Sequence, residues 1–338
     1  MKKRFVLSGY FGFKNFGDEA ILSVLINKLQ KDGHKITVIS SDPKYTTEQY
    51  KYIRSIQTFK ILDIIFAILK SDVLVSGGGS LLQDVTSIKS LIYYLTIIFI
   101  ALILQKKVII FAQGIGPINN KFGQILTKIL LKHCTYVSVR DKKSFELLES
   151  WGIESDLLCD PIFSTVIPST EKTNTVAVQL RNFNTMNRDF IDRLAQKTVQ
   201  EFSEKKIEIF SFQDSIDYDI CQEFQKAVNL LNPHIETKLY SNLSNEDIIN
   251  KLSKAEFLIA MRFHAIIIGL LAECKILSIN YDIKVEKISN EFNIPMLDLK
   301  KEFSTQFNEL KKQIPQNKKE QLKKNSFNWT NFDLAINK

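Results

Sequence analysis

Short, mostly apolar strand patterns alternate with helical patterns along the first half of the chain, and this alternation restricts the fold more than any other feature. A helical pattern runs from Glu19 to about Lys31, and another begins near Asp141. Strands that are apolar along their whole length are typical of a parallel sheet covered on both faces. The βαβα order therefore predicts a doubly wound α/β domain. The strands of this first half are expected at Arg4–Ser8, Lys35–Ser40, Asp72–Ser76, Val108–Ala112 and Thr135–Val139.

The alternation stops in a polar, turn-rich stretch at Pro161–Asn174 and then begins again. A single hydrophobic core usually stops growing at about 250–300 residues, so a chain of 338 residues is expected to form two domains. We predict an α/β fold with two doubly wound Rossmann-like domains, at residues 1–165 and 166–300, followed by a basic helical tail at 301–338. Ligands of such domains bind at the carboxyl ends of the strands, and a cleft between the domains is the expected place for a substrate. The second set of strands is expected at Val176–Leu180, Ile207–Phe212, Glu236–Tyr240, Phe257–Ala260 and Ile276–Ile279, and its helices at Asp189–Phe202, Tyr218–Leu231, Asn245–Leu252 and Ala265–Ala272.

The net charge of +8 is spread along the chain and is densest at Lys311–Lys324. A solvated basic face accounts for it, and attraction to an anionic substrate or to an anionic membrane surface are the alternatives. No nucleic-acid-binding motif accompanies the charge, so a nucleic-acid partner is not expected. The four cysteines are far apart and show no Cys-x-x-Cys spacing, so we expect no zinc site or other metal site and a reducing compartment.

Two segments bear on the location of the protein. Met1–Phe5 runs directly into a strand pattern and lacks the apolar core of a signal peptide, so a cytoplasmic location is expected. Leu91–Leu104 is almost wholly apolar, but it is shorter than the ~20 residues that span a bilayer. We interpret this segment as a helix buried on both sides. A helix that also touches a membrane surface is the alternative.

Glycine-rich segments follow three of the expected strands, reading GYFGFKNFGDEA, SGGGSLLQD and QGIGP. Glycine allows positive φ and close backbone approach, and a loop of this kind that opens a helix presents N–H groups to an anion. The spacing matches neither a dinucleotide-binding fingerprint nor a P-loop. Tight turns without a ligand are the alternative interpretation. The binding candidates in these segments are Gly12, Asn15, Gly77, Gly78, Gly79, Ser80, Gln83, Asp84, Gln113 and Gly114.

Asp18 and Glu19 stand at the opening of the first helix. Acidic residues in a first helical turn are favourable beside the helix dipole, which gives them a structural explanation. A carboxylate at the ligand-binding edge can instead accept a proton from a hydroxyl substrate or orient it by a hydrogen bond. Both residues are therefore candidate catalytic bases.

Cations recur where a strand gives way to a helix, in VRD, MRFHA and NYDIK. Arg140, Arg262, His264 and Lys284 lie at these positions, and a small ligand with a carboxylate and a phosphate needs such a set. Solvated surface charge is the alternative for each cation, and a hydrogen-bonded core position is the alternative for His264. Histidine can donate a proton near neutral pH, so His264 is a candidate catalytic acid.

In this order, GYFGFKNFGDEAIL, SGGGSLLQD, FAQGIGP, SVRDKKS, MRFHA and NYDIKV resemble the polysaccharide pyruvyl transferase family, especially the bacterial cell-surface enzymes that act on secondary cell-wall polymers. The resemblance spans Arg4 to Pro295. It implies a GT-B-like fold and transfer of the pyruvyl group of phosphoenolpyruvate to two hydroxyls of a sugar. The product is a cyclic ketal, and phosphate is released.

The resemblance associates Arg140, His264 and Lys284 with the donor. Phosphoenolpyruvate is a substrate in this scheme, and no cofactor is expected. The partner is a sugar acceptor in cell-wall or exopolysaccharide biosynthesis. Attachment of that acceptor to a lipid, with peripheral contact at the inner face of the membrane, is a further expectation. Two alternatives stay open: a nucleotide-sugar-dependent glycosyltransferase of GT-B fold, and a non-enzymatic envelope protein that binds anionic polymer.

Overall fold

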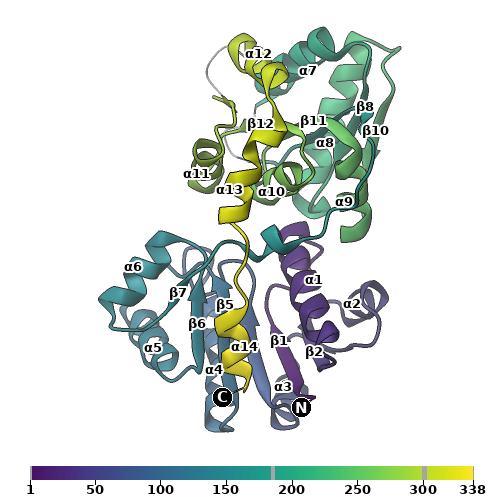
Figure 1. Cartoon of the computed structure of the whole chain (residues 1–338). Coiled ribbons are helices and arrows are strands. Elements are labelled where there is room, and N and C mark those ends of the chain that lie inside the picture. The colour runs from purple at the N-terminus through teal and green to yellow at the C-terminus, as the bar shows by residue number, and fades with distance from the viewer. Residues whose placement is uncertain (1, 184–186, 299–302, 338) are drawn as a thin grey trace. The chain divides into compact units, whose positions relative to one another are not determined.

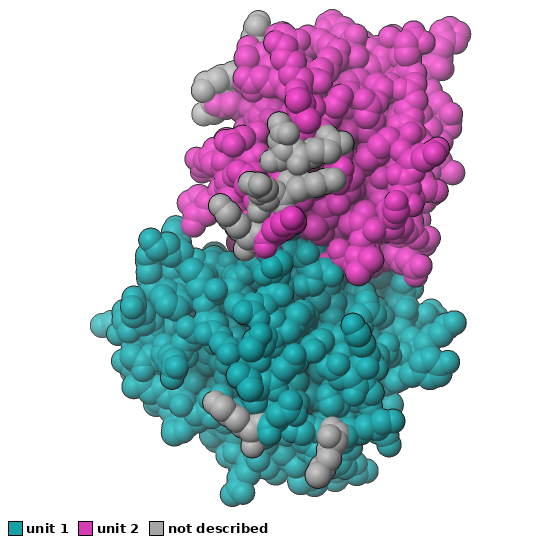
Figure 2. All heavy atoms as spheres, viewed as in Figure 1, with its two compact units in different colours: residues 1–164, 326–338 teal, residues 165–325 magenta. Residues whose placement is uncertain are grey.

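The computed structural model describes residues 2–183, 187–298 and 303–337, and the chain divides into two compact units (Figure 2). Unit 1 consists of Met1–Ser164 and Ser326–Lys338, and unit 2 of Thr165–Asn325. The division lies one residue from the boundary drawn after residue 165. The segment interpreted as a C-terminal tail is shared, because its first part belongs to unit 2 and its last part to unit 1.

Unit 1 is built on a seven-stranded parallel sheet (Figure 1). The strand order reverses between β1 and β4, which makes their carboxyl ends the topological switch point where ligands of such folds bind. The five strands expected in this half all form, and β3 and β7 add an edge strand on each side. Across the sheet the order is β3 (Arg54–Gln57), β2 (Lys35–Ser40), β1 (Arg4–Ser8), β4 (Val73–Gly77), β5 (Lys107–Gln113), β6 (Tyr136–Val139) and β7 (Asp156–Leu157).

Helices cover both faces of this sheet. Right-handed crossovers place α1 and α2 on one face and the helices from α3 to α6 on the other. The C-terminal α14 packs against β5 and β6, where Phe111 of β5 contacts Trp329 and Phe332. The bounds are α1 (Phe16–Lys31), α2 (Pro43–Gln49), α3 (Ile61–Leu69), α4 (Ile88–Ile103), α5 (Lys121–Lys132), α6 (Lys142–Ser150), the 3-10 turn η1 (Pro161–Ser164) and α14 (Thr330–Asn337).

The apolar Leu91–Leu104 segment lies mainly in α4. Leu91, Leu95 and Ile98 are buried in the same cluster as residues of the sheet. Phe99 and Ile103 are exposed, however, so the prediction that this helix is buried on both sides is wrong. Over the residues that the structure describes, no helix is long and apolar enough to cross a membrane.

Unit 2 repeats the architecture with a six-stranded parallel sheet, whose switch point lies between β8 and β11. The strand order is β10 (Thr237–Tyr240), β9 (Lys206–Phe210), β8 (Thr173–Gln179), β11 (Ala255–Ala260), β12 (Lys275–Ile279) and β13 (Met296–Leu297). The predicted α/β fold with two Rossmann-like domains is confirmed. The helical segments are α7 (Arg188–Phe202), α8 (Asp214–Leu231), α9 (Asn245–Lys254), α10 (Phe263–Leu271), α11 (Ile283–Glu291), α12 (Ser304–Lys312), the 3-10 turn η2 (Pro315–Lys318) and α13 (Lys319–Lys324).

Candidate functional site

The two glycine-rich loops after β4 and β5 run together at the carboxyl edge of unit 1. Gly114 N–H donates to the Gly79 carbonyl at 3.0 Å, and Gly116 N–H donates to the Leu82 carbonyl at 2.8 Å. A Cβ on Gly114 would lie 2.5 Å from Ser80 Oγ. These glycines therefore allow a close approach of two loops beside the switch point, as the sequence suggested for this edge.

Asp18, in the first turn of α1, lies against the loop after β4. A Cβ on Gly79 would be 2.5 Å from Asp18 Oδ1, and Gly79 has φ +64. Burial, and then the charge of Asp18, raise the pKa of Tyr10 and Tyr94. Asp18 therefore lies between the segments that follow β1 and β4, and 9% of its surface is exposed. The structure brings this predicted residue to the switch point itself.

Glu19, the next residue, is 1% exposed. Its Oε1 accepts the Gly12 N–H at 2.6 Å, and its buried Oε2 has no hydrogen-bond partner among the described residues. Burial is the main cause that raises the pKa of Glu19 to about 8, and the backbone of Gly12 acts in the opposite direction. Glu19 therefore anchors the first glycine loop from inside.

Arg140 follows β6 and is held in a buried ion pair. Its Nη1 lies 2.5 Å from Asp160 Oδ2, and the two side chains are 8% and 2% exposed. Its Nη2 approaches Ser80 Oγ at 3.5 Å. The cation predicted for the donor is therefore positioned by Asp160 beside the loop that follows β4, in unit 1.

Several other predicted binding residues of unit 1 make local structural bonds. Asn15 caps α1 by accepting the Gly17 N–H at 3.1 Å. The Asp84 carboxylate accepts the Asn119 and Asn120 N–H groups, which are the main cause that lowers its pKa. The remaining two examples are Gln83, which bonds to Thr86, and buried Gln113, whose Nε2 donates to Ser76 Oγ at 3.0 Å.

Arg262 of unit 2 stands at the N-cap position of α10 and is nearly buried. Its Nε and Nη2 each lie 2.7 Å from one oxygen of Asp217, which forms a two-pronged ion pair. Asp217 also accepts the N–H groups of Phe212 and Gln213. Burial raises the pKa of Asp217, although Arg262 acts in the opposite direction. This pair connects the exits of β9 and β11, so the predicted binding residue Arg262 has a structural role.

His264 occupies the first turn of α10, directly after β11, and its side chain is half-buried. The Arg262 side chain makes no capping hydrogen bond at this helix N-terminus, whose N–H groups and dipole favour an anion. Lys284 occupies the same place on α11 and is exposed. The structure therefore brings two of the predicted cations to the carboxyl edge of the unit 2 sheet.

Arg181 was missed by the sequence interpretation and lies just after β8, on the other side of the same switch point. Its guanidinium lies over the Tyr281 ring, 5.9 Å from the centroid. Its buried Nε has no hydrogen-bond partner among the residues that the structure describes. The signal was available, because Arg181 follows a predicted strand as Arg140 and Arg262 do.

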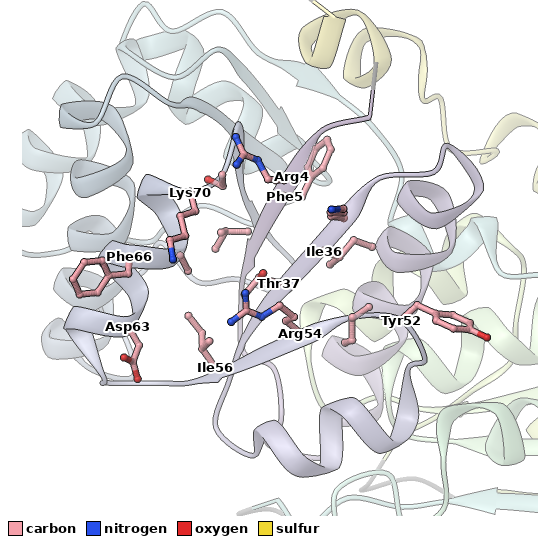
Figure 3. A pocket seen from close by; sticks show the side chains of 15 residues that line it. Arg4, Phe5, Ile36, Thr37, Tyr52, Arg54, Ile56, Asp63, Phe66 and Lys70 are labelled. Carbon is pink, nitrogen blue, oxygen red and sulfur yellow. The ribbon is translucent and has the colours of Figure 1, made fainter.

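A groove of about 790 Å³ lies at the opposite edge of the unit 1 sheet, at the amino ends of β1 to β3 (Figure 3). Its lining includes the cations Arg4, Lys35, Arg54 and Lys70, together with Phe66 of α3. No residue predicted for the site lines it. Among the described residues, no group of three or more His, Cys, Asp or Glu side chains is placed to hold a metal ion.

A family model described as polysaccharide pyruvyl transferase matches residues 15–283 of the chain. The matched range contains Asp18, Arg140 and His264, whereas β1 lies before it and Lys284 directly after it. No curated protein matches the sequence.

Several solved structures resemble the whole chain in fold. The UDP-GlcNAc 2-epimerase from Methanocaldococcus jannaschii has a TM-score of 0.64 at 12% identity, over 93% of each chain. A glycosyltransferase from Rickettsia africae has a TM-score of 0.62 at 15% identity, over 99% of this chain and 96% of its own. HepE from Anabaena, solved with UDP-glucose, has a TM-score of 0.61 at 11% identity, over 99% and 98%. At these identities the likeness concerns the fold alone, which is GT-B-like.

Proposed function

Because the chain belongs to the polysaccharide pyruvyl transferase family, we propose that it transfers the pyruvyl group of phosphoenolpyruvate to two hydroxyls of one sugar in a cell-surface glycan. The two new C–O bonds form a cyclic ketal, and phosphate leaves. The family match over residues 15–283 carries this proposal, and the cations at the strand ends support it.

In the proposed donor site, unit 2 binds phosphoenolpyruvate through the cations at its switch point. The uncapped N-terminus of α10 suits a phosphate, and the Arg181 guanidinium suits the forked oxygens of a phosphate or a carboxylate. Lys284 adds a positive charge from α11. Arg262 contributes indirectly, since its ion pair with Asp217 fixes the start of α10.

The proposed reaction begins with proton transfer from His264 to the methylene carbon of phosphoenolpyruvate. A sugar hydroxyl then adds to the neighbouring carbon, phosphate departs, and the second hydroxyl closes the ketal. One of the two hydroxyl protons replaces the proton on His264, and the other leaves with phosphate. We assign Asp18 as the base that receives a hydroxyl proton, because Glu19 is enclosed and bonded to Gly12.

A direct test supplies the purified protein with phosphoenolpyruvate and a β-mannosaminyl or galactosyl acceptor. Release of phosphate together with a pyruvyl mass increase on the sugar is expected. Turnover of a UDP- or GDP-sugar without use of phosphoenolpyruvate would show a glycosyltransferase instead. His264→Gln and Asp18→Asn should each lower kcat by about 10²–10⁴-fold. The non-enzymatic alternative would be favoured if the unsubstituted protein shows no turnover and these variants bind anionic polymer as strongly as it does.

The acceptor is further proposed to be carried on a lipid at the inner face of the membrane. The basic surface and the exposed apolar side chains of unit 1 support this location. Comparison of a lipid-linked acceptor with its short soluble analogue tests the proposal. A lower KM for the lipid-linked form in the presence of vesicles is expected, and equal KM values would contradict it.

A further inference from the structure

Three neighbouring helices of unit 1 present apolar side chains to solvent. Right-handed crossovers place α3, α4 and α5 on one face of the sheet, α4 packs against both of the others, and each helix also buries its own inner side. The outward residues recur every three or four positions, which puts them on one side of each helix. They are 48–71% exposed and comprise Leu62, Phe66 and Leu69 of α3, Phe99 and Ile103 of α4, and Phe122, Ile125 and Ile129 of α5. We call these eight residues the apolar face.

Two other helices show that such an apolar face is not a general property of the fold. The outer side of α7 in unit 2 carries ion pairs one turn apart, such as Arg188 with Asp192 and Arg193 with Asp189. On unit 1 itself, α6 is next to this layer and carries Lys142 and Glu146 in the same arrangement. A soluble protein rarely exposes so many large apolar side chains together unless the surface has a partner.

The charges around the apolar face are almost all positive. Residues 60–70, 87–104 and 120–133, all of which the structure describes, contain one acidic residue, Asp63. Their six lysines are Lys60, Lys70, Lys89, Lys121, Lys128 and Lys132. An apolar surface with a basic border is complementary to a lipid bilayer with anionic headgroups, and like charges on a second copy would repel it.

We propose that unit 1 docks on an anionic lipid membrane through the apolar face, with its lysines against the headgroups. The groove in Figure 3 extends the basic border, because Phe66 and Lys70 of α3 line it together with Arg54 and Lys35. Asp63 and apolar side chains such as Ile36 and Ile56 also line this open groove, and its cations together with these apolar side chains suit a phosphate headgroup with part of its acyl chain. No helix needs to cross the bilayer, since the side chains that would enter it all lie on one side of their helices.

Flotation of the full chain with vesicles tests the proposal. Vesicles of equal parts phosphatidylcholine and phosphatidylglycerol should carry the protein upward, and pure phosphatidylcholine should carry much less. High salt should release the protein in part, because it screens the lysines and leaves the apolar contribution.

Matched variants assign the binding to the face. The triple variant Phe122→Gln, Ile125→Gln, Ile129→Gln should bind the mixed vesicles at least about tenfold more weakly. Lys121→Glu with Lys132→Glu should have a similar effect on mixed vesicles only. The control is Leu230→Gln with Leu231→Gln on α8 of unit 2, which also removes exposed apolar side chains and should leave binding unchanged. All these positions are solvent-exposed, and circular dichroism checks that each variant is folded.

Two results would overturn the proposal. One is a protein that stays at the bottom of the gradient with mixed vesicles. The other is binding that the control variant weakens as much as the α5 variant does. Together with either result, self-association of wild type that the α5 variant abolishes in sedimentation would show that the face is an interface between copies. Flotation uses neither donor nor acceptor, so its outcome is independent of the pyruvyl transfer that we propose.

Discussion

Two arginines at the switch point of unit 2 differ in what holds their guanidinium groups. Arg262 bonds both oxygens of Asp217, and neither side chain is more than 8% exposed. Arg181 is only half-buried, and its Nε has no hydrogen-bond partner among the described residues. The first arginine therefore stabilises the fold, and the second is available to a ligand.

Substitution by methionine should separate these roles. Arg262→Met should lower the free energy of unfolding by about 3–5 kcal/mol, because it leaves the Asp217 charge buried without its partner. Arg181→Met should change stability by less than about 1 kcal/mol and raise the KM for phosphoenolpyruvate about 10–100-fold. Urea unfolding followed by circular dichroism and a KM measurement check both expectations. Equal effects of the two variants on stability would contradict the distinction.

Glu19 should make stability depend on pH. Its pKa is raised to about 8, whereas the carboxyl in the unfolded chain titrates near the ordinary value of about 4.3. Between these values the folded protein holds a proton that the unfolded chain has lost, so the free energy of unfolding decreases as pH rises.

Glu19→Gln keeps the shape of the side chain, its acceptor for Gly12 N–H and its neutral state. The variant should therefore lose this part of the pH dependence. Its free energy of unfolding relative to that of wild type should increase as the pH rises from about 5 to about 8. Urea unfolding at a series of pH values measures it. A difference that does not change with pH would show that Glu19 titrates normally.

At the scale of a single loop, the turn after β4 brings Asp18 to the switch point. Gly79 has φ +64, and a Cβ there would meet Asp18 Oδ1 at 2.5 Å. Gly152 after α6 has almost the same φ, +65, but a Cβ there meets nothing within 4 Å. Alanine would therefore introduce the same backbone strain at both positions, but only at Gly79 would it also displace a neighbouring side chain, that of Asp18.

Gly79→Ala and Gly152→Ala should each lose about 1–2 kcal/mol of stability from the left-handed backbone. Only Gly79→Ala should also lower kcat, by at least about tenfold, since it displaces the proposed base. The comparison of kcat at matched folded fractions tests this. If Gly152→Ala lowers kcat as much, the loss is due to strain and not to Asp18.

Strands and helices with a clear apolar run or a clear polar–apolar alternation were predicted well from the sequence, and elements without such a pattern were missed. Strands such as β1 and β2 match their predicted bounds, because both faces of these strands are buried and the apolar run ends where the strand ends. The edge strand β3 reads RSIQ and has no fully buried residue, so it carries no such run. Helix α3 reads ILDIIFAIL, and apart from Asp63 its exposed side is also apolar, which leaves little of the polar–apolar alternation that marks a helix.

At the scale of the whole molecule, the chain ends by completing the unit in which it began. Phe332 of α14 is fully buried and contacts Phe111 of β5. The Ile336 carbonyl accepts a hydrogen bond of 2.9 Å from the Lys107 ammonium group and another from the Lys3 ammonium group. The last residues therefore contribute core and hydrogen bonds to the unit 1 sheet.

Phe332→Ala should lower the free energy of unfolding of unit 1 by about 3–5 kcal/mol, because it leaves a cavity against β5. Leu334→Ala in the same helix should change it by about 0.5 kcal/mol or less, since Leu334 is exposed. Both tryptophans, Trp151 and Trp329, lie in unit 1, so their fluorescence during urea unfolding reports on this unit. A small effect of Phe332→Ala would show that α14 is not part of its core.

The sequence alone determined the two Rossmann-like domains, the strand ends that carry the candidate site residues, and the family. These features depend on local patterns, namely apolar runs, glycine positions and short ordered motifs, which can be recognised without distant contacts. Only the tertiary structure decided which charged residue has which role. Asp217 lies 45 positions before Arg262, and Asp160 lies 20 positions after Arg140, and neither spacing marks an ion pair. The same is true of the apolar face, because exposure follows from which side of a helix the sheet covers, and α3 and α4 carry apolar side chains on both sides.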